Sequence, residues 1–269
     1  MPDLNPISWW LKLLALPNES RTKTLAVAFL VSGVCALVVS SAAVILEPLQ
    51  EANRAAERQA RLEAMMAAMP GMADILSESG ADRLESVVVD LNKTAVTDID
   101  PAGFDMRAAA TDPETSTPIP PEADVAGLGR RTNYAVVHIL RSGDALRLVI
   151  LPISAAGYQS TIHANLALQG DLNTVAGLSI VEQGETPGLG ARIEEPAWQA
   201  LWPGKKLANA EGEIRLSVVR GRATNEYEVD GITGATRTGN AVTEAVQFWL
   251  GDFGYGPLLD KLRAGALDQ

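Results

Sequence analysis

Three hydroxyl groups that could take part in chemistry lie close together in the sequence, on Thr233, Thr236 and Thr238. Directly after them, apolar residues recur at i, i+3, i+4 and i+7 from Val242, which predicts a helix that begins right after Thr238. Thr238 is then expected at or beside the N-cap, where its hydroxyl can accept a hydrogen bond from an unpaired amide. The same amides and the helix dipole favour an anion such as phosphate. The segment therefore predicts either an ordinary cap or a phosphate site.

The run Thr-Gly-Ala-Thr-Arg-Thr at residues 233–238 resembles the flavinylation motif Ser/Thr-Gly-Ala-Ser/Thr-x-Thr. That motif belongs to the FMN-binding subunits of the sodium-translocating NADH:quinone reductases and of the related Rnf-type ferredoxin:NAD reductases. In this family the last threonine of the motif carries FMN through a phosphoester bond, which the resemblance places on Thr238. Asp230, three residues before the first hydroxyl, also matches. The resemblance implies that the other motif residues shape the loop or bond the phosphate: Thr233, Gly234, Ala235 and Thr236.

A second run, Glu-Thr-Pro-Gly-Leu-Gly from Glu185 to Gly190, resembles another signature of the same family. Its proline and glycines predict a tight loop. The resemblance implies that this loop binds flavin, with Thr186 and free backbone amides at an edge of the ring and Leu189 on a ring face. Without the family context, the loop would be interpreted as a surface turn.

Two expectations concern the immediate surroundings of the flavin. Tyr158 is expected to contact it, in place of the tryptophan that the family has at the position of Gln159. Thr238 has no neighbouring base in the sequence that would activate its hydroxyl. A separate flavin transferase is therefore expected to make the covalent bond.

Composition and charge exclude several classes of function. The net charge of −11 argues against nucleic-acid binding, which needs a basic surface. The single cysteine, Cys35, cannot by itself hold an iron–sulfur cluster with thiolate ligands. His138 and His163 lack partners at metal-ligand spacing, and no nicotinamide-binding glycine fingerprint follows a strand. The chain is therefore expected to need other membrane subunits as electron donor and acceptor.

Residues 25–46 carry no charged side chain over 22 residues. As a helix they would extend roughly 33 Å, enough to cross the hydrocarbon core of a bilayer. Their length favours a transmembrane helix over the shorter core of a cleaved signal peptide. Residues 1–24 precede the span, and the adjacent Trp9 and Trp10 fit either an interfacial helix or a disordered tail.

The charges nearest to the span predict its orientation. Lys23 is the nearest charge on its N-terminal side and Glu47 the nearest on the other side. Because positive charge favours the cytoplasmic side, residues 1–24 are expected in the cytoplasm. Residues 47–269 are then expected to form the FMN-binding domain on the periplasmic side of a bacterial inner membrane.

The pattern of the large domain predicts an α+β fold with a mostly antiparallel sheet, because strands occur in runs and do not alternate strictly with helices. Five prolines within residues 100–133 predict a long loop or an insertion there. Strands are predicted over residues 86–91, 134–140, 145–153, 161–168, 176–182 and 213–220. Besides the helix after Thr238, helices are predicted over residues 47–66, 72–77, 196–202 and 258–263.

The resemblance implies an electron-transfer subunit of a sodium-translocating NADH:ubiquinone reductase, which relays electrons from NADH toward quinone through one covalent FMN. The flavin would supply the redox chemistry and the protein would position it, with no catalytic side chain and no metal. Residues 248–257 resemble the end of the C subunit of that enzyme more than the Rnf-type subunit. Two alternatives stay open at this point, an Rnf-type homologue and a non-enzymatic membrane-anchored module.

Overall fold

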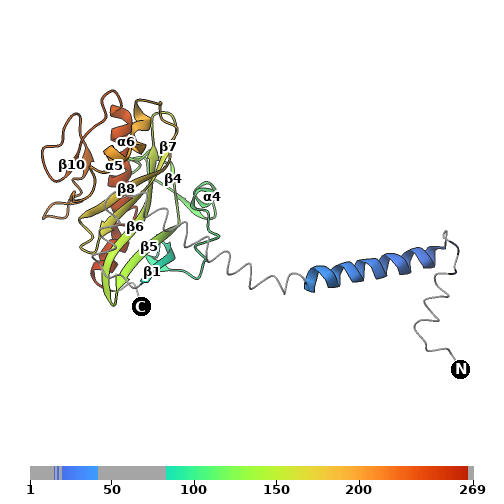
Figure 1. The fold of residues 1–269 in the computed structure, drawn as a ribbon. Helices are drawn as coiled ribbons and strands as arrows, with labels where there is room; N and C mark the ends of the chain where they lie inside the picture. Colours follow the sequence, from blue (N-terminus) through green and yellow to red (C-terminus); the bar gives the residue numbers. More distant parts are fainter. Residues whose placement is uncertain (1–14, 16, 18–19, 42–82, 266–269) are drawn as a thin grey trace. The chain divides into compact units, whose positions relative to one another are not determined.

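The computed structural model describes residues 15, 17, 20–41 and 83–265 (Figure 1). The chain divides into two units, residues 1–61 and 62–269, and each is described by itself. The first unit contains a helix over Arg21–Ser41 with a mean hydropathy of 2.2. Its length and composition allow it to cross a membrane. It begins four residues before the predicted span, and residues 42–46 lie outside the described residues.

Three other predicted segments also lie outside the described residues. They are the tryptophan-containing N-terminal segment and the helices predicted over residues 47–66 and 72–77.

A six-stranded sheet in the order β2-β1-β5-β6-β7-β8 organises the second unit, and every neighbouring pair is antiparallel. The predicted α+β class with a mostly antiparallel sheet is confirmed. Alternation along β6 explains its place in the core, because Val149, Leu151 and Ile153 all join the hydrophobic cluster on one face. The strands of this sheet are β1 (Arg83–Asp90), β2 (Ala95–Val96), β5 (Tyr134–Ser142), β6 (Ala145–Ala156), β7 (Thr161–Gln169) and β8 (Val175–Glu182).

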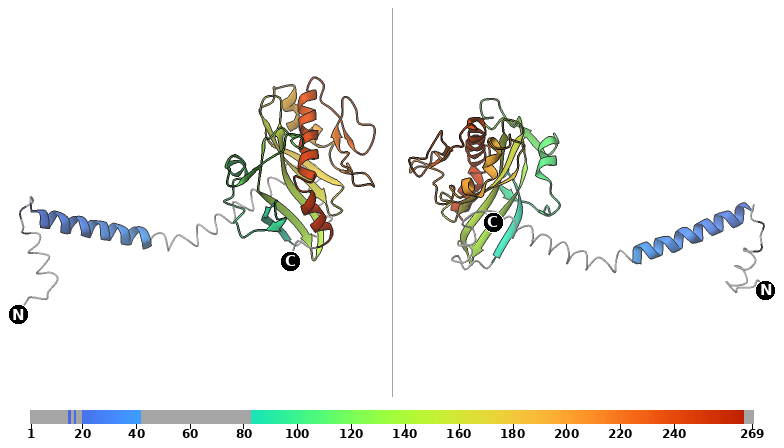
Figure 2. Two further views of the ribbon diagram at one scale, coloured as in Figure 1. Left: turned by 180° about the vertical axis from the view of Figure 1, so that it is seen from behind. Right: turned by 45° about the horizontal axis from the view of Figure 1, so that its top comes forward.

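Two helices near the C-terminus, α6 (Thr236–Leu250) and α7 (Gly256–Arg263), lie against one face of the sheet (Figure 2). Their apolar residues belong to the same cluster as the strands, with Val246 fully buried. The predicted end of α6 at Gly251 is confirmed, since Gly251 is its C-cap. The helical period in the sequence therefore identified the face of α6 that packs on the sheet.

Hydrogen bonds at one edge of β6 anchor this C-terminal part. β5 pairs with β6 only as far as Ile150, whereas β7 pairs with β6 as far as Ala156. The carbonyl of Ser154 accepts a hydrogen bond from Trp249 Nε1, and that of Pro152 accepts one from Tyr255 Oη, both at 2.8 Å. Pro152 is tolerated in β6 at this point because proline has no backbone N–H that would need an acceptor on a neighbouring strand.

Residues 100–133 are predicted to be a long loop or insertion, and the loop alternative is wrong because the segment contains regular secondary structure. This region contains a short helix, whose N-cap Asp105 accepts hydrogen bonds from the amides of Arg107 and Ala108, and a two-stranded antiparallel sheet. The prolines flank these elements and do not prevent them, because Pro118 lies at the end of an edge strand. The elements are α4 (Met106–Thr111), β3 (Ser116–Pro118) and β4 (Arg130–Thr132).

The strand predicted over residues 213–220 is much shorter in the structure. Only β9 (Ser217–Val218) forms a ladder, in parallel with β10 (Glu228–Val229). The alternation still describes burial correctly, since Leu216 and Val218 are buried. Alternating burial needs only an extended backbone, whereas a strand also needs a hydrogen-bonding partner. The remaining local elements are η1 (Gly190–Glu194) and α5 (Pro196–Gln199), the latter shorter than predicted.

His138 is expected to make the stability of this domain sensitive to acid. Its Nδ1 lies 2.8 Å from Ser86 Oγ on the neighbouring strand, and burial lowers its pKa from 6.5 to about 4. Between these pH values the unfolded chain binds more protons than the folded one, so the free energy of unfolding falls as the pH drops. The loss amounts to at most about 3 kcal/mol and is complete near pH 4. Urea denaturation of the detergent-solubilised protein between pH 7 and pH 4 measures it.

The matched variant for this prediction is His138→Gln, which keeps a polar side chain and cannot gain a proton. Its free energy of unfolding should depend less on pH than that of the wild type over the same range. Equal slopes for the two proteins would assign the acid sensitivity to other groups.

Candidate functional site

Thr238 lies inside the first turn of α6 and not at its cap. The N-cap is Ala235, and the first helical bond runs from Gly239 N to the Ala235 carbonyl at 3.0 Å. The prediction of Thr238 at the N-cap is therefore wrong. The physical reason is the turn before the helix, in which Gly234 adopts a φ of 80° and Ala235 N donates to the Ile232 carbonyl. This turn brings the chain into the helix three residues earlier than the apolar period indicates.

The hydroxyl of Thr238 instead meets a buried carboxylate. Thr238 is 3% exposed and Glu185 is 4% exposed, and Thr238 Oγ1 donates a hydrogen bond to Glu185 Oε2 at 2.5 Å. The other oxygen, Glu185 Oε1, accepts hydrogen bonds from the backbone amides of Tyr158 and Gln159 at 2.8 and 2.9 Å. The expectation that Thr238 has no neighbouring base is therefore wrong in space, although it holds along the sequence.

Glycines allow this close packing. A Cβ on Gly190 would lie 2.5 Å from Thr238 Oγ1 and 2.9 Å from Glu185 Oε2. A Cβ on Gly157 would lie 2.6 Å from Glu185 Oε1. These distances are shorter than van der Waals contact permits, so the carboxylate and the hydroxyl can meet only where these two positions have no side chain.

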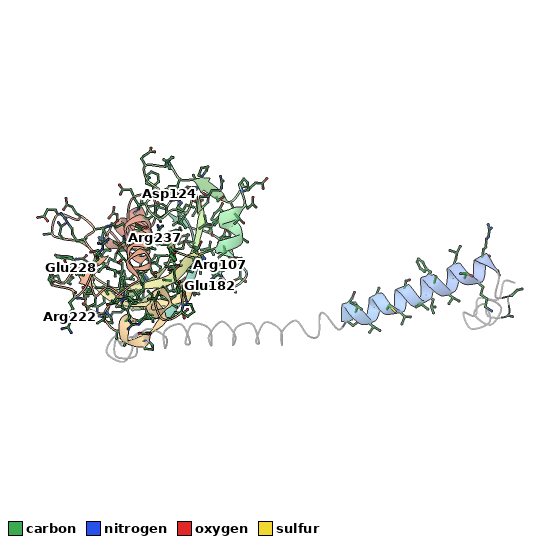
Figure 3. All side chains as sticks on the ribbon, turned by 90° about the horizontal axis from the view of Figure 1, so that it is seen from above. Arg107, Asp124, Glu182, Arg222, Glu228 and Arg237 are labelled. Atoms are coloured by element: carbon green, nitrogen blue, oxygen red, sulfur yellow. The ribbon has the colours of Figure 1, made fainter. Side chains whose placement is uncertain are left out.

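Two large side chains remain exposed next to this buried pair. Tyr158 is 60% exposed and Leu189 is 43% exposed. Leu189 lies beside the motif loop, because a Cβ on Gly234 would be 3.1 Å from Leu189 Cδ2. The guanidinium carbon of Arg237 lies 5.8 Å from the centre of the Tyr158 ring, within range of a cation–π contact. Figure 3 labels Arg237 on α6.

The structure thus brings the two predicted loops together around Thr238. Glu185 and Gly190 touch it directly, whereas Tyr158 and Leu189 border the site from the surface. Thr186 shapes its own loop, because its carbonyl accepts hydrogen bonds from the amides of Leu189 and Ala191. The other four predicted residues of the motif loop line a separate pocket: Thr233, Gly234, Ala235 and Thr236.

That pocket has a volume of about 210 Å³ and is lined by residues 218–221, 231–236, Gly239 and Asn240. Thr238 is not among its lining residues. Pockets that enclose a ligand of drug size usually measure about 300–1,000 Å³. The pocket on the motif loop is smaller than that range.

The helix end favours a negative charge near Thr238, whereas the neighbouring Glu185 carboxylate opposes a second one. The first-turn amides of α6 have no intrahelical acceptor, and the positive end of the helix dipole points toward this turn. The Glu185 carboxylate accepts hydrogen bonds from the Thr238 hydroxyl and from the amides of Tyr158 and Gln159. The sequence did not reveal two further features of the site, the amides of Tyr158 and Gln159 that bind Glu185 and the guanidinium of Arg237 beside the Tyr158 ring. Arg237 occupies the variable position of the motif, which gives no signal of its own.

Known proteins resemble this chain over nearly its whole length. The FMN-binding domain family matches residues 157–251. The C subunit of the Na(+)-translocating NADH-quinone reductase of Vibrio alginolyticus is 40% identical over 257 residues, which cover 95% of this chain and 100% of that protein. This chain belongs to the C-subunit family of the Na(+)-translocating NADH-quinone reductases. The corresponding protein of Pseudomonas aeruginosa is 39% identical over 256 residues, covering 92% of this chain and 98% of that protein.

Solved structures from this family agree in fold. The structure of NqrC from Shewanella oneidensis matches with a TM-score of 0.64 at 32% sequence identity, over 72% of this chain and 88% of that chain. The C subunit from Parabacteroides distasonis matches with a TM-score of 0.51 at 26% identity, over 70% of this chain and 82% of that one. Membership of this family places the chain with the sodium-translocating enzymes and favours that interpretation over the Rnf-type alternative.

Proposed function

We propose that this chain is the FMN-carrying electron-transfer subunit of a sodium-translocating NADH:quinone reductase, with FMN joined to Thr238 by a phosphoester bond. The observation that carries the proposal is the buried Thr238 hydroxyl in the first turn of α6, at the meeting point of the two loops that resemble the family's flavin signatures. Family membership and the match to the FMN-binding domain support the same conclusion.

The N-terminal turn of α6 and the exposed side chains beside it would suit FMN, with Glu185 the one neighbouring negative charge. A phosphate on Thr238 would lie at the N-terminal turn of a 15-residue helix, which favours a negative charge by about 0.3–1 kcal/mol. Beside it, Tyr158 offers an aromatic face and Leu189 an apolar one, and both are exposed in the part of the chain that the structure describes. Exposed apolar groups next to an anion site suit a ligand that is charged at one end and aromatic at the other.

When bound, FMN supplies the redox chemistry. Each residue of the site then has a positional role. Thr238 anchors the phosphate end on a rigid helix, while the first-turn amides stabilise its charge. Tyr158 and Leu189 contact the ring and exclude water from its faces, and Arg237 is close enough to Tyr158 to hold that ring in place. The protein's contribution is orientation and electrostatics, as for other cofactor proteins.

The proposed function requires partners. Within residues 20–41 and 83–265, no group of three or more His, Cys, Asp or Glu side chains could hold a metal ion. Because the chain belongs to the C-subunit family of a reductase with several subunits, its flavin would exchange electrons with other subunits of that enzyme, and a flavin transferase would attach it. The helix Arg21–Ser41 would hold the chain in a bacterial inner membrane as a single span. The FMN-binding domain would then lie on the periplasmic side, as the charges flanking the span indicate.

Denaturing electrophoresis and peptide mass mapping test the proposal. The protein, co-expressed with a flavin transferase, should give a yellow fluorescent band that survives denaturation. A tryptic digest should place the added mass of FMN less one water on Thr238. Modification on Thr233 or Thr236, or flavin that is released on denaturation, would contradict the assignment. Unmodified protein expressed without the transferase is the control.

A further inference from the structure

We propose that Glu185 is the general base for flavin attachment, accepting the proton of the Thr238 hydroxyl when the phosphoester bond forms. This inference rests on the proposed function, because it concerns how Thr238 is modified. The acceptor protein would then supply a catalytic group to its own modification, and the flavin transferase would not have to provide the only base.

The geometry supports this role. Glu185 Oε2 and Thr238 Oγ1 are 2.5 Å apart, within the distance that a general base needs from the proton it removes. Glu185 Oε1 is held by two backbone amides of the turn between β6 and β7, so the carboxylate is fixed from its far side. The turn between β6 and β7 therefore helps to direct Glu185 Oε2 at the Thr238 hydroxyl, in addition to the loop that carries Glu185.

Formation of the phosphoester bond requires a flavin donor whose phosphorus carries a leaving group. A phosphate monoester is a poor phosphoryl donor, so we assign the donor to the class in which the FMN phosphoryl group carries a leaving group through a pyrophosphate bond, as in a flavin dinucleotide. Thr238 Oγ1 forms a bond to phosphorus, the pyrophosphate P–O bond breaks, and the nucleoside monophosphate leaves. The hydroxyl proton passes to Glu185 Oε2. No electrons are gained or lost.

A carboxylate in this position has a parallel in general phosphoryl-transfer chemistry. Protein kinases place an aspartate beside the substrate hydroxyl, where it accepts the proton and orients the attacking oxygen. Glu185 has the same relation to Thr238, with the hydroxyl acting as the acceptor substrate. By comparison, Thr233 is exposed and makes no hydrogen bond to Glu185 in the described part of the chain, which explains why attachment would select Thr238 over Thr233.

Access to the hydroxyl requires movement of the loop that covers it. Thr238 is 3% exposed, and Gly190 lies directly over its oxygen. Gly188, with a φ of 76°, and the exposed Leu189 lie on the outer part of this loop. A shift of these residues would uncover Thr238 Oγ1, while the hydrogen bonds from the amides of Tyr158 and Gln159 would hold Glu185 in place.

The test measures the rate of attachment in vitro. Purified full-length protein is mixed with a flavin transferase and a flavin dinucleotide, and covalent flavin is followed by in-gel fluorescence and by peptide mass. Glu185→Gln keeps the shape of the side chain and loses the basic oxygen, so the rate should fall about 100-fold or more.

The matched control is Glu182→Gln. Glu182 is an exposed carboxylate at the end of β8 that pairs with Arg107, and Figure 3 labels these two side chains next to each other. This variant removes the same charge from the same segment of the chain without touching Thr238. It should take up flavin at the wild-type rate.

The outcomes separate the two proposals. A Glu185→Gln protein that is labelled on Thr238 at a rate within about threefold of the wild type would overturn the role of Glu185 and leave the proposed function intact. If Glu185→Gln fails to fold, the pair Glu185→Asp and Glu185→Asn decides, since the two differ mainly in the ability to accept a proton. Equal rates for that pair would overturn the role, and a faster rate for Asp would support it. Absence of flavin on Thr238 in the wild type would overturn both proposals.

Discussion

Thr238→Ala is expected to abolish covalent flavin completely while the domain still folds. The substitution removes the oxygen that would form the ester, and no other described hydroxyl shares its contact with Glu185. It also leaves Glu185 Oε2 buried without a partner, which lowers the free energy of unfolding by about 1–3 kcal/mol. That loss is smaller than the total stability of about 5–15 kcal/mol that is usual for a domain. In-gel fluorescence after denaturation measures the first effect and thermal melting the second.

Two matched variants define what this result means. Thr238→Ser keeps a hydroxyl in the same place and should retain attachment, whereas Thr236→Ala should weaken it at most. Thr236 is partly exposed, lines the pocket on the motif loop and makes no hydrogen bond to Glu185 within the described residues. Covalent flavin that persists in Thr238→Ala, or that disappears in Thr236→Ala alone, would move the attachment to another residue.

The central sheet was predictable because its signals are local. Strands β5 to β8 are short apolar runs separated by turn residues, and each begins within one residue of its predicted start. The pattern of burial along β9 was also correct, since Leu216 and Val218 are buried. The predicted length of this strand was wrong, because β9 pairs only with β10, a strand about ten residues further along the chain that the local pattern does not reveal.

The site was predictable only in part. Each of the two loops carries a recognisable run of residues, so the residues around Thr238 could be named in advance. The contact that gives the site its chemistry could not, because Glu185 and Thr238 are 53 positions apart and no local pattern links them. The same holds for the amides of Tyr158 and Gln159, since a backbone group leaves no signature in the sequence. The start of α6 was misplaced because an apolar period reports the buried face of a helix and not its first residue.

Gly190→Ala is expected to disrupt both attachment and stability through a single added methyl group. That methyl would lie 2.5 Å from Thr238 Oγ1, 2.8 Å from Glu185 Cβ and 2.9 Å from Glu185 Oε2. All three atoms belong to buried side chains, so either the loop or the carboxylate must shift. Such overpacking typically lowers the free energy of unfolding by about 1–3 kcal/mol. Displacing Glu185 from the hydroxyl should slow flavin attachment by about tenfold or more.

Two further alanine variants separate crowding from other effects of replacing glycine. Gly103→Ala adds a methyl where nothing lies within 4 Å and should change neither property. Gly188→Ala lies in the same loop as Gly190 and also meets nothing within 4 Å, but its φ of 76° strains an alanine. It should therefore lower stability by about 1 kcal/mol with less effect on attachment. Gly190 has no such backbone requirement, so a loss of attachment in Gly190→Ala that Gly188→Ala does not share comes from the contact with Thr238 and Glu185. Equal attachment rates in all three variants would show that the close packing over Thr238 has no part in the modification.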